Sequence, residues 1–298
     1  MEIKSYLKEQ RALVEKAFDG YVPAAEGVFR DHVEAMRYSL LAGGKRMRPI
    51  LCLAAARAVG GDTVVENDLL PVACALECIH TYSLIHDDLP AMDNDELRRG
   101  KPTNHVLFGE AGAILAGDGL LTWAFDLLSN TTYGNLDAEK RLRIIHVIAR
   151  GAGSLGMVGG QALDIAHEKT AFPFETLQAI HRSKTGALIT ASVLAGALGA
   201  GADARQLDAL GRYGDQLGLA FQIVDDLLNA TATTEQLGKT AGSDAELGKA
   251  TYPAYFGVEE TRTKALAAVE KAKGALLEFD GKSEPLRLLA DYIYTRSH

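Results

Sequence analysis

Cysteine, proline and long hydrophobic runs are all scarce in this chain. The three cysteines are odd in number and lack the spacing of a metal site, so we expect reduced thiols in the core of a cytoplasmic protein. The first residues mix both charges with apolar side chains, unlike the hydrophobic centre of a signal peptide. The most apolar stretch, residues 187–202, is rich in Ala and Gly and falls short of the roughly 18 strongly apolar residues of a membrane span. We therefore expect no membrane span.

The balance of charge is acidic. The 298 residues include 39 Asp and Glu against 31 Lys and Arg, which gives a formal net charge of −8 at pH 7. This balance argues against a general nucleic-acid-binding surface, because such surfaces gather Lys and Arg to neutralise phosphates. If the ligand is an anion, local clusters of cations or a bound metal must overcome the repulsive field of the protein.

Strand-like alternation is nearly absent, and apolar residues recur at the three- and four-residue spacing of helices. Helix-start signals agree, since Asp68 precedes Pro71 and Thr251 precedes Pro253. The pattern predicts an all-α fold of about ten or more helices. The periodic segments are residues 7–18, 28–41, 51–59, 69–85, 113–128, 142–149, 177–198, 207–228, 263–277 and 286–293.

The chain shows no obvious internal boundary. It contains no linker rich in proline or serine and no solenoid-type repeat of about 20–50 residues. Its length admits two domains, but the missing linker favours one domain over residues 1–298. The most polar stretch between predicted helices runs from Thr231 to Lys249, and its length suggests a functional flap.

Acidic residues crowd the end of one predicted helix, in the segment from His86 to Glu96. Carboxylates repel one another there, and the negative end of the helix dipole disfavours them, so a bound cation is the natural compensation. Asp87 and Asp93 do not share one face of a continuous helix, but Pro90 breaks the helix and lets the chain bring Asp93 back toward Asp87. The alternative is a solvated acidic helix end.

A second acidic group lies inside a strongly apolar predicted helix. Asp225 and Asp226 are flanked on both sides by Ile, Val and Leu, and Asn229 follows Asp225 by four residues on the same face. Uncompensated buried charge is costly, so these acids point to a bound ligand. A few carboxylates suit Mg²⁺, which keeps waters and takes its other ligands from substrate phosphates. Two such sites suggest a diphosphate held between them.

Basic residues gather close to the acidic groups in this acidic chain. Lys45 and Arg48 follow a glycine pair, and Arg98 and Arg99 follow the first acidic group. Arg matches phosphate oxygens with two parallel N–H groups, Lys supplies a point charge, and glycine lets the backbone approach a ligand. Alone, each cluster is more often a solvated surface run, and only its proximity to an acidic group favours a phosphate site.

Six segments carry a resemblance to a known family. They are residues 43–49, 87–93, 98–103, 159–161, 184–186 and 221–226. In these segments, and over nearly its whole length, the chain resembles the trans-isoprenyl diphosphate synthases, most closely bacterial-type farnesyl diphosphate synthases. The resemblance implies an all-α, single-domain helical bundle around a deep central cavity, usually as a homodimer. It also implies that the two aspartate motifs face each other and bind about two or three Mg²⁺ ions per active site.

The resemblance assigns the metal ligands residue by residue. Asp87 and Asp93 resemble ligands of the first Mg²⁺ site, and Asp225 resembles a ligand of the second. The supporting acids are Asp88, Asp226 and Asp244. The second motif departs from the family pattern, because Asn229 stands where an Asp is usual. We expect a tolerated change outside the metal's own ligands, because Asp225 and Asp226 remain; a weakened metal site is the alternative.

The resemblance also assigns the substrate contacts. Those for the allylic diphosphate are Arg98, Lys184 and Lys239. Those for isopentenyl diphosphate are Gly44, Lys45, Arg48, His80 and Arg99. Thr185 and Gln222 resemble substrate contacts whose oxygen dipoles stabilise the allylic cation. The assignment of Lys249 as a substrate contact rests on a weaker match.

The implied reaction is the condensation of isopentenyl diphosphate with dimethylallyl or geranyl diphosphate to give farnesyl diphosphate. Mg²⁺ and basic residues stabilise the departing diphosphate, which leaves an allylic cation. The double bond of a pre-positioned isopentenyl diphosphate attacks that cation, and a proton is lost to the released diphosphate. The catalytic set is Lys184, Thr185, Gln222, Arg98 and Lys239.

Product length is expected to depend on the helix that carries Asp87. Tyr82 lies five residues before Asp87, about 7–8 Å along a helix axis, so its ring could close the floor of the cavity. In the family, an aromatic residue here with a small neighbour, as in Tyr82 and Ser83, is similar to the farnesyl-length arrangement. The alternative is that Tyr82 is an ordinary core residue.

Three other functions remain open. A geranylgeranyl diphosphate synthase has the same chemistry and a deeper cavity. A terpene cyclase needs no isopentenyl diphosphate pocket, so Lys45, Arg48 and Arg99 argue against it. An inactive regulatory subunit of a heteromeric synthase has Asn229 as its only indication.

Overall fold

The computed structural model describes residues 1–61, 66–168, 170, 172–231 and 250–295. Most of the predicted flap lies outside these residues, and so do Lys239, Asp244 and Lys249. The chain forms two compact units. The first contains Met1–Ile3, Ala54–Val64 and His146–His298, and the second contains Lys4–Leu53 and Val65–Ile145. The prediction of a single domain stays a prediction.

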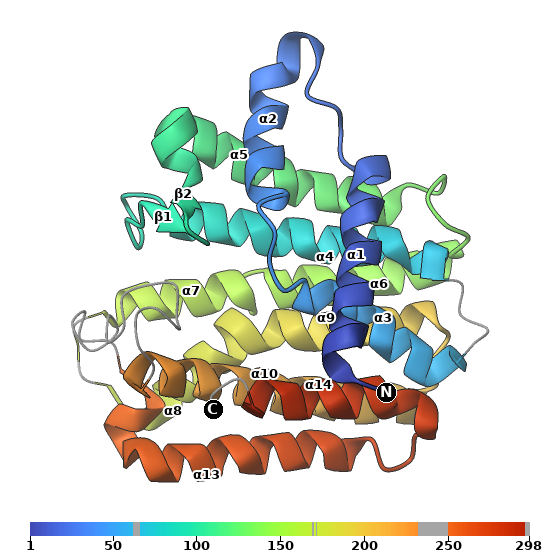
Figure 1. Cartoon of the computed structure of the whole chain (residues 1–298), viewed down its shortest axis with the longest axis vertical. Coiled ribbons are helices and arrows are strands. Elements are labelled where there is room, and N and C mark those ends of the chain that lie inside the picture. Colours follow the sequence, from blue (N-terminus) through green and yellow to red (C-terminus); the bar gives the residue numbers. More distant parts are fainter. Residues whose placement is uncertain (62–65, 169, 171, 232–249, 296–298) are drawn as a thin grey trace. The chain divides into compact units, whose positions relative to one another are not determined.

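The second unit is a group of helices that pack against the long helix α4, which lies beside α5 (Figure 1). Small and aliphatic residues such as Ala113, Ala116 and Leu120 bury one face of α5, while Leu76 and Ile79 of α4 are fully buried. Its elements are α1 (Ile3–Tyr21), η1 (Gly27–Phe29), α2 (Arg30–Leu40), the start of α3 (Met47–Gly60), α4 (Glu66–Asp87), β1 (Leu97–Arg98), β2 (Lys101–Pro102), α5 (Asn104–Ser129) and the start of α6 (Ala138–Ala152). Strands β1 and β2 form a short antiparallel hairpin.

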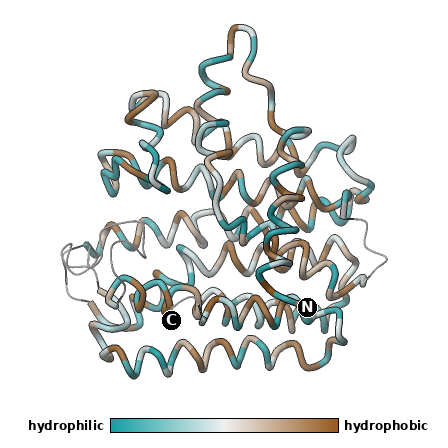
Figure 2. Tube along the Cα trace, in the orientation of Figure 1, coloured by the Kyte–Doolittle hydropathy of each residue, from teal (hydrophilic) through white to brown (hydrophobic). Residues whose placement is uncertain are grey.

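The first unit is organised around α10, which packs against α13 and α9. Hydrophobic and hydrophilic residues alternate along these helices in Figure 2, and the buried side chains include Tyr213, Leu217 and Val269. Its further elements are α7 (Met157–Ala166), α8 (Phe174–Ile180), the π-helical turn η3 (His181–Gly186), α9 (Ala187–Gly199), α10 (Ala204–Thr231), α13 (Tyr252–Ala275), η4 (Gly281–Ser283) and α14 (Glu284–Thr295).

The expected all-α fold is confirmed. Each periodic segment overlaps a helix, because burial of one apolar face stabilises a helix that its sequence pattern favours. The pattern did not predict α7, which is rich in glycine, or the β1–β2 hairpin. Helix α4 also begins earlier than the Asp68 signal indicated, at Glu66. Asp68 instead accepts hydrogen bonds from the backbone and side-chain nitrogens of Asn135.

The three cysteines, Cys52, Cys74 and Cys78, are free thiols and are fully buried. Burial raises the pKa of Cys52 to about 12 and raises the pKa of the other two thiols as well. They are therefore protonated residues of the core, as the sequence predicted.

Two helices of the second unit are long and apolar enough to cross a membrane on length and composition alone. They are α4 and α5, whose apolar windows are Asn67–Asp87 and Asn104–Ser129. The window in α4 is 78% buried, as expected for a core helix, whereas the window in α5 is only 39% buried. The expected absence of a membrane span therefore stays a prediction.

A buried arginine holds the loop between α5 and α6. Arg141 is 5% exposed, and its guanidinium donates to the backbone carbonyls of Leu128, Tyr133, Gly134 and Leu136. The delocalised fork of N–H groups satisfies several carbonyls at once, which a lysine cannot do in the same geometry.

Candidate functional site

The first acidic motif turns back on itself at the end of α4. The helix ends at Asp87, and the carbonyl of Asp87 accepts the backbone N–H of Asp93 at 2.9 Å. The N–H of Asn94 bonds to the carbonyl of Leu89 at 3.1 Å, and Asn94 has a left-handed φ of 53°. The predicted return of Asp93 toward Asp87 is thus confirmed. Asp87 is half-buried and Asp93 is exposed, so two hard oxygen donors flank one helix end.

Asp88 is paired with a side chain of the β1–β2 hairpin. It is 2% exposed, and Nε of Arg98 donates to both of its carboxylate oxygens at 2.8 Å. Burial raises the pKa of Asp88, and the hydrogen bonds from Arg98 offset part of that rise. The ion pair therefore holds the β1–β2 hairpin against the end of α4. Both carboxylate oxygens of Asp88 are occupied by this contact within the protein.

Asp226 of the second motif is also engaged by protein. Its carboxylate accepts the backbone N–H of Tyr252 at 2.9 Å and Nε2 of Gln222 at 3.2 Å, and it is 4% exposed. Tyr252 is the first residue of α13, whose N-cap Thr251 makes no side-chain capping bond. Asp226, on another helix, thus performs the capping that the sequence assigned to Thr251.

Both motifs divide their acids in the same way. The first acid, Asp87 or Asp225, is half-buried, while the second, Asp88 or Asp226, is buried and hydrogen-bonded. Adjacent residues on a helix point about 100° apart, so one carboxylate can hold the fold while the other faces a ligand. Asn229 is 5% exposed, and its expected place outside the metal's own ligands stays a prediction.

The acids present suit a metal that takes few protein ligands. Among the described residues, no group of three or more His, Cys, Asp or Glu side chains is arranged to hold a metal. Mg²⁺ in phosphate-binding sites takes one or two carboxylates and completes its shell with waters and phosphate oxygens. Asp87 with Asp93 provides such a donor set in the second unit, and Asp225 provides one carboxylate in the first.

The predicted isopentenyl diphosphate residues gather in the second unit. Lys45 is exposed and Arg48 half-buried, and an N–H of Arg99 donates to the carbonyl of Gly43. Gly44 has a φ of 131°, a backbone conformation that residues with a Cβ rarely adopt, so the position favours glycine. Burial and the surrounding arginines lower the pKa of His80 well below its usual value, which leaves a neutral imidazole among cations.

Lys184 and Thr185 lie in the π-helical turn η3, a feature often found at functional sites. Nζ of Lys184 is 2.6 Å from a carboxylate oxygen of Asp164, and Oγ1 of Thr185 donates to Oε1 of Gln222 at 2.9 Å. The predicted cation-stabilising pair, Thr185 and Gln222, is therefore brought together.

Two glycines allow these contacts. A Cβ on Gly160 of α7 would lie 2.2 Å from the backbone nitrogen of Lys184, and one on Gly218 of α10 would lie 2.6 Å from Cα of Gly186. Close crossing of α7 and α10 with η3 thus brings Asp164 and Gln222 to the turn, so the glycine-rich segment has a packing reason.

Sequence reasoning missed His181, which opens the π-helical turn. It is 6% exposed, stacks on the ring of Tyr252 at 5.5 Å, and its Nε2 is 3.9 Å from Asp226. Burial lowers the pKa of His181 to about 3, although Asp164 opposes this effect, so the imidazole is neutral at pH 7. Its position three residues before Lys184 was the only available signal, since the sequence does not show the long-range contact with Tyr252.

The predicted chain-length residues lie on α4. Tyr82 is 6% exposed, and its ring meets the ring of His86 edge-on at 5.7 Å. Nε2 of His86 is 3.0 Å from the carbonyl of Ile114 on α5, and Oγ of Ser83 donates to the carbonyl of His80. The Tyr82 ring is thus held in place by a side chain anchored to the neighbouring helix.

Residues 31–277 of the chain match the polyprenyl synthetase family. The chain belongs to this family. Its prenyltransferase class, expected from the aspartate motifs, is confirmed. The second acidic motif of this synthetase lies in the first unit and the first motif in the second, and their opposition across a cavity stays a prediction.

Relatives of this synthetase carry more than one product name. A farnesyl diphosphate synthase of Geobacillus stearothermophilus is 48% identical over 298 residues, covering 100% of this chain and 99% of that protein. A geranylgeranyl diphosphate synthase of Cyanophora paradoxa is also 48% identical, over 295 residues, covering 99% of this chain and 96% of that protein. A solved FPP/GFPP synthase from Zymomonas mobilis aligns with a TM-score of 0.87 at 38% identity and covers 98% of both chains.

Asp226 and Asp225 are predicted to differ in their effect on stability. Asp226→Ala removes the cap of α13 and leaves a buried N–H without its acceptor, so the free energy of unfolding falls by about 1–3 kcal/mol. Asp225→Ala, at a half-buried position, causes a smaller loss in the metal-free protein. Urea denaturation followed by circular dichroism measures both. Equal stability of the two variants would contradict the division of roles between these acids.

Proposed function

We propose that this prenyltransferase condenses isopentenyl diphosphate with dimethylallyl and geranyl diphosphate and releases farnesyl diphosphate. The observation that carries the proposal is Tyr82, a buried aromatic ring on α4 one and a half turns before Asp87. A prenyl chain that grows from the metal site along α4 meets this ring after about 7–8 Å of helix axis. The ring of His86 contacts the Tyr82 ring edge-on and is itself bound to the Ile114 carbonyl of α5. This contact supports a fixed position for the Tyr82 ring.

Geranylgeranyl diphosphate synthesis is the second candidate. The relative from Cyanophora paradoxa carries that name at the same 48% identity as the farnesyl diphosphate synthase of Geobacillus stearothermophilus. Overall similarity therefore favours neither product, and the ring at Tyr82 is the reason to prefer the shorter one.

Ionisation of the allylic diphosphate depends on cations that this chain holds in place. Arg98 is hydrogen-bonded to Asp88, and Lys184 is hydrogen-bonded to Asp164. Each cationic side chain is therefore oriented before the substrate binds. Each still has further N–H groups that can donate to phosphate oxygens, because guanidinium carries five and ammonium three. Mg²⁺, two or three ions when bound at Asp87, Asp93 and Asp225, supplies further positive charge to the departing diphosphate.

The allylic cation is stabilised by oxygen dipoles that do not react with it. Thr185 and Gln222 are hydrogen-bonded to each other, and Gln222 is bonded in turn to Asp226. This chain of contacts fixes both oxygens before the charge develops, which is the condition for electrostatic stabilisation of a transition state. Isopentenyl diphosphate is held by Lys45, Arg48 and Arg99 near the neutral imidazole of His80.

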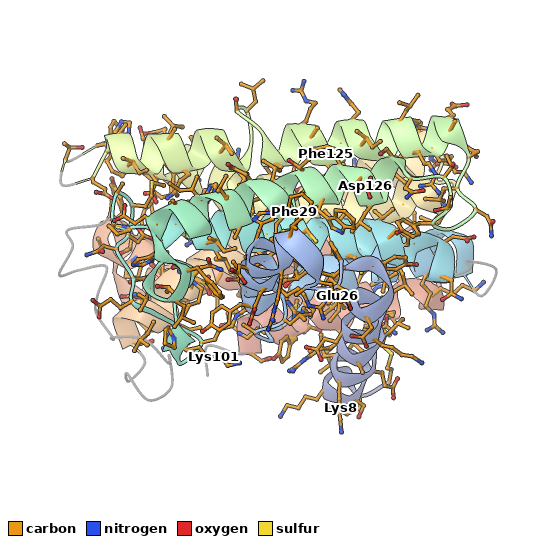
Figure 3. The ribbon with its side chains drawn as sticks, turned by 90° about the horizontal axis from the view of Figure 1, so that it is seen from above. Lys8, Glu26, Phe29, Lys101, Phe125 and Asp126 are labelled. Atoms are coloured by element: carbon orange, nitrogen blue, oxygen red, sulfur yellow. The ribbon has the colours of Figure 1, made fainter. Side chains whose placement is uncertain are left out.

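We also propose that the protein is a cytoplasmic homodimer without a membrane span. The helix α5 exposes Ile114 and Leu115 at 43% and 56%, and Phe29, just before α2, is 71% exposed (Figure 3). A second copy of the chain that presents the same face would bury these side chains in one isologous contact. The fully buried, protonated thiols support a reducing compartment.

The proposed reaction predicts a metal-dependent C15 product. The purified chain incubated with Mg²⁺, dimethylallyl diphosphate and labelled isopentenyl diphosphate yields farnesyl diphosphate, and addition of EDTA abolishes turnover. Chromatography of the dephosphorylated products gives the chain length. A dominant C20 product supports the second candidate, a cyclic hydrocarbon indicates a terpene cyclase, and no product from the chain alone indicates a regulatory subunit.

Replacement of the floor residue is predicted to lengthen the product. Tyr82→Ala removes the ring and extends the cavity, so products of C20 or longer replace much of the C15 product. Tyr82→Phe keeps the ring and serves as the control that retains C15. Product chromatography compares the two, and unchanged C15 output from Tyr82→Ala would eliminate Tyr82 as the floor.

A charge on the apolar face of α5 is predicted to separate the subunits. Leu115→Glu places a carboxylate in the proposed contact, so the mass measured by light scattering falls from that of a dimer to that of a monomer. Leu277→Glu, at a position 83% exposed after α13, is the control that keeps the dimer mass. A wild-type chain that is already a monomer would overturn the proposed assembly.

A further inference from the structure

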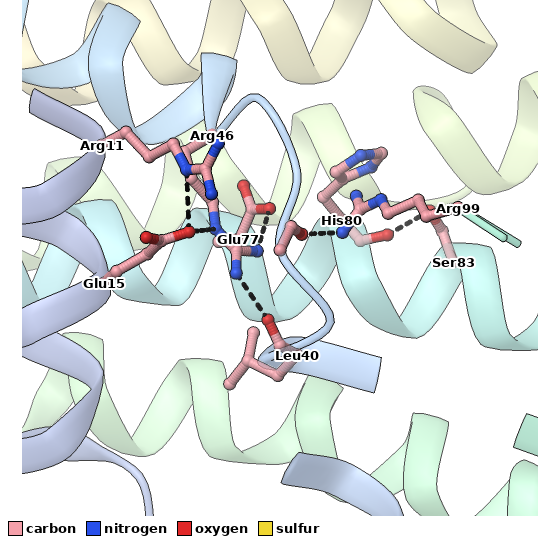
Figure 4. A network of polar contacts seen from close by, with 9 residues as sticks. Arg11, Glu15, Leu40, Arg46, Glu77, His80, Ser83 and Arg99 are labelled. Atoms are coloured by element: carbon pink, nitrogen blue, oxygen red, sulfur yellow. Dashed lines mark hydrogen bonds and ion pairs between the residues drawn. The ribbon is translucent and has the colours of Figure 1, made fainter. Parts of the chain in front are cut away.

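A buried ion pair lies beneath the basic loop of the second unit. Nη1 of Arg46 is 2.8 Å from a carboxylate oxygen of Glu77, and the two side chains are 1% and 2% exposed. Nη2 of Arg46 donates to the carbonyl of Leu40 at 2.8 Å (Figure 4). The guanidinium also lies over the ring of Phe18, 5.3 Å from its centroid. Arg46 lies within the basic segment 43–49 that carries part of the family resemblance, whereas Glu77 was not singled out by its pattern in the sequence.

We propose that Arg46 and Glu77 are positioning residues that set the isopentenyl diphosphate pocket. The proposal rests on the proposed function, because it assumes that Lys45, Arg48 and His80 bind that substrate. The pair itself is buried, so it touches no substrate and acts only through its neighbours.

The positions of Arg46 and Glu77 in the chain explain how the pair can orient the pocket residues. Arg46 stands between Lys45 and the start of α3, and its φ of 52° belongs to the left-handed region that most residues avoid. A side chain fixed at this point determines the direction of Lys45 on one side and of Arg48, in the first turn of α3, on the other. Glu77 lies three residues before His80 on α4, so the same ion pair aligns the loop with the helix that carries His80.

Stabilisation of the fold alone does not explain the ion pair of Arg46 and Glu77. Oε2 of Glu77 is buried, and among the described residues it has no hydrogen-bond partner. Desolvation of two charges is repaid only when all of their polar atoms are satisfied, and well-packed apolar residues often replace such pairs without loss of stability. A strained backbone and an incompletely satisfied ion pair at one place are more consistent with a geometric role than with a stabilising one.

A second contact of the loop, made by Arg99, supports the same positioning role. Arg99 donates to the carbonyl of Gly43 at the other end of the loop, and Glu77 and Arg46 are among the charges that act on its guanidinium. The loop is thus held at Gly43 by the hairpin and at Arg46 by α4, with Lys45 between the two anchors.

Replacement of both charges by apolar residues tests the proposal. The variant Arg46→Met with Glu77→Met leaves no unpaired buried charge, so we expect stability close to that of the wild type. We expect KM for isopentenyl diphosphate to rise at least about tenfold, while KM for the allylic substrate changes by less than about twofold, because only one pocket loses its alignment. A wild-type KM for isopentenyl diphosphate, or an equal rise in both KM values, overturns the proposal.

Arg141→Met is the matched control. It removes another buried arginine of the same unit, one whose guanidinium donates, among the described residues, to backbone carbonyls at the end of α5 and in the loop that follows it. We expect this variant to lose stability without any split between the two KM values. A KM split of the same size in Arg141→Met would show that lost stability alone produces it, and would overturn the proposal.

A conservative variant decides the matter if the double variant does not fold. Arg46→Lys keeps the charge but cannot donate to Glu77 and to the Leu40 carbonyl together, so a smaller rise in KM, about threefold or more, is expected for isopentenyl diphosphate alone. An unchanged KM overturns the proposal. A wild-type chain that catalyses no prenyl transfer refutes the proposed function instead, whereas an active wild type with an unaffected variant refutes only the positioning role.

Discussion

The site depends on carboxylates that are held by the protein itself. Asp88 is bound by Arg98, and Asp226 by the first N–H of α13, so each aspartate motif is fixed by its second acid. The first acid of each motif then points about 100° away and is half-buried. The second acid of each motif thus contributes to the fold, and the role of the first acid as a metal ligand stays a prediction.

The basic side chains of the site are also held by contacts within the protein. In an acidic chain, an anion site needs basic groups held in place, and unpaired cations in a half-buried site repel one another. Arg98 is paired with Asp88 in the second unit, and Lys184 with Asp164 in the first, which offsets the charge of each cation while leaving N–H groups to donate. The neutral state of His80 and His181 follows from the same crowding, since burial and nearby cations oppose a further positive charge.

The sequence predicted whatever a local pattern determines. Helical periodicity located the helices, and Pro90 after an acidic helix end was enough to predict the return of Asp93. Contacts between residues far apart in the sequence could not be predicted. Arg46 and Glu77 are 31 residues apart. No local pattern shows that Asp226, and not Thr251, caps α13. Gly160 allows a close crossing of α7 with the turn η3, and only coordinates show that this crossing brings Asp164 to Lys184.

The buried thiols have a practical consequence. Alkylating and oxidising reagents attack the thiolate, and the raised pKa values of Cys52, Cys74 and Cys78 keep that form negligible while the helices stay closed. Labelling by such a reagent therefore records each opening of the core around α3 and α4. We therefore expect the folded protein to resist oxidation of its thiols, and we expect the rate of labelling to measure how often the core opens locally.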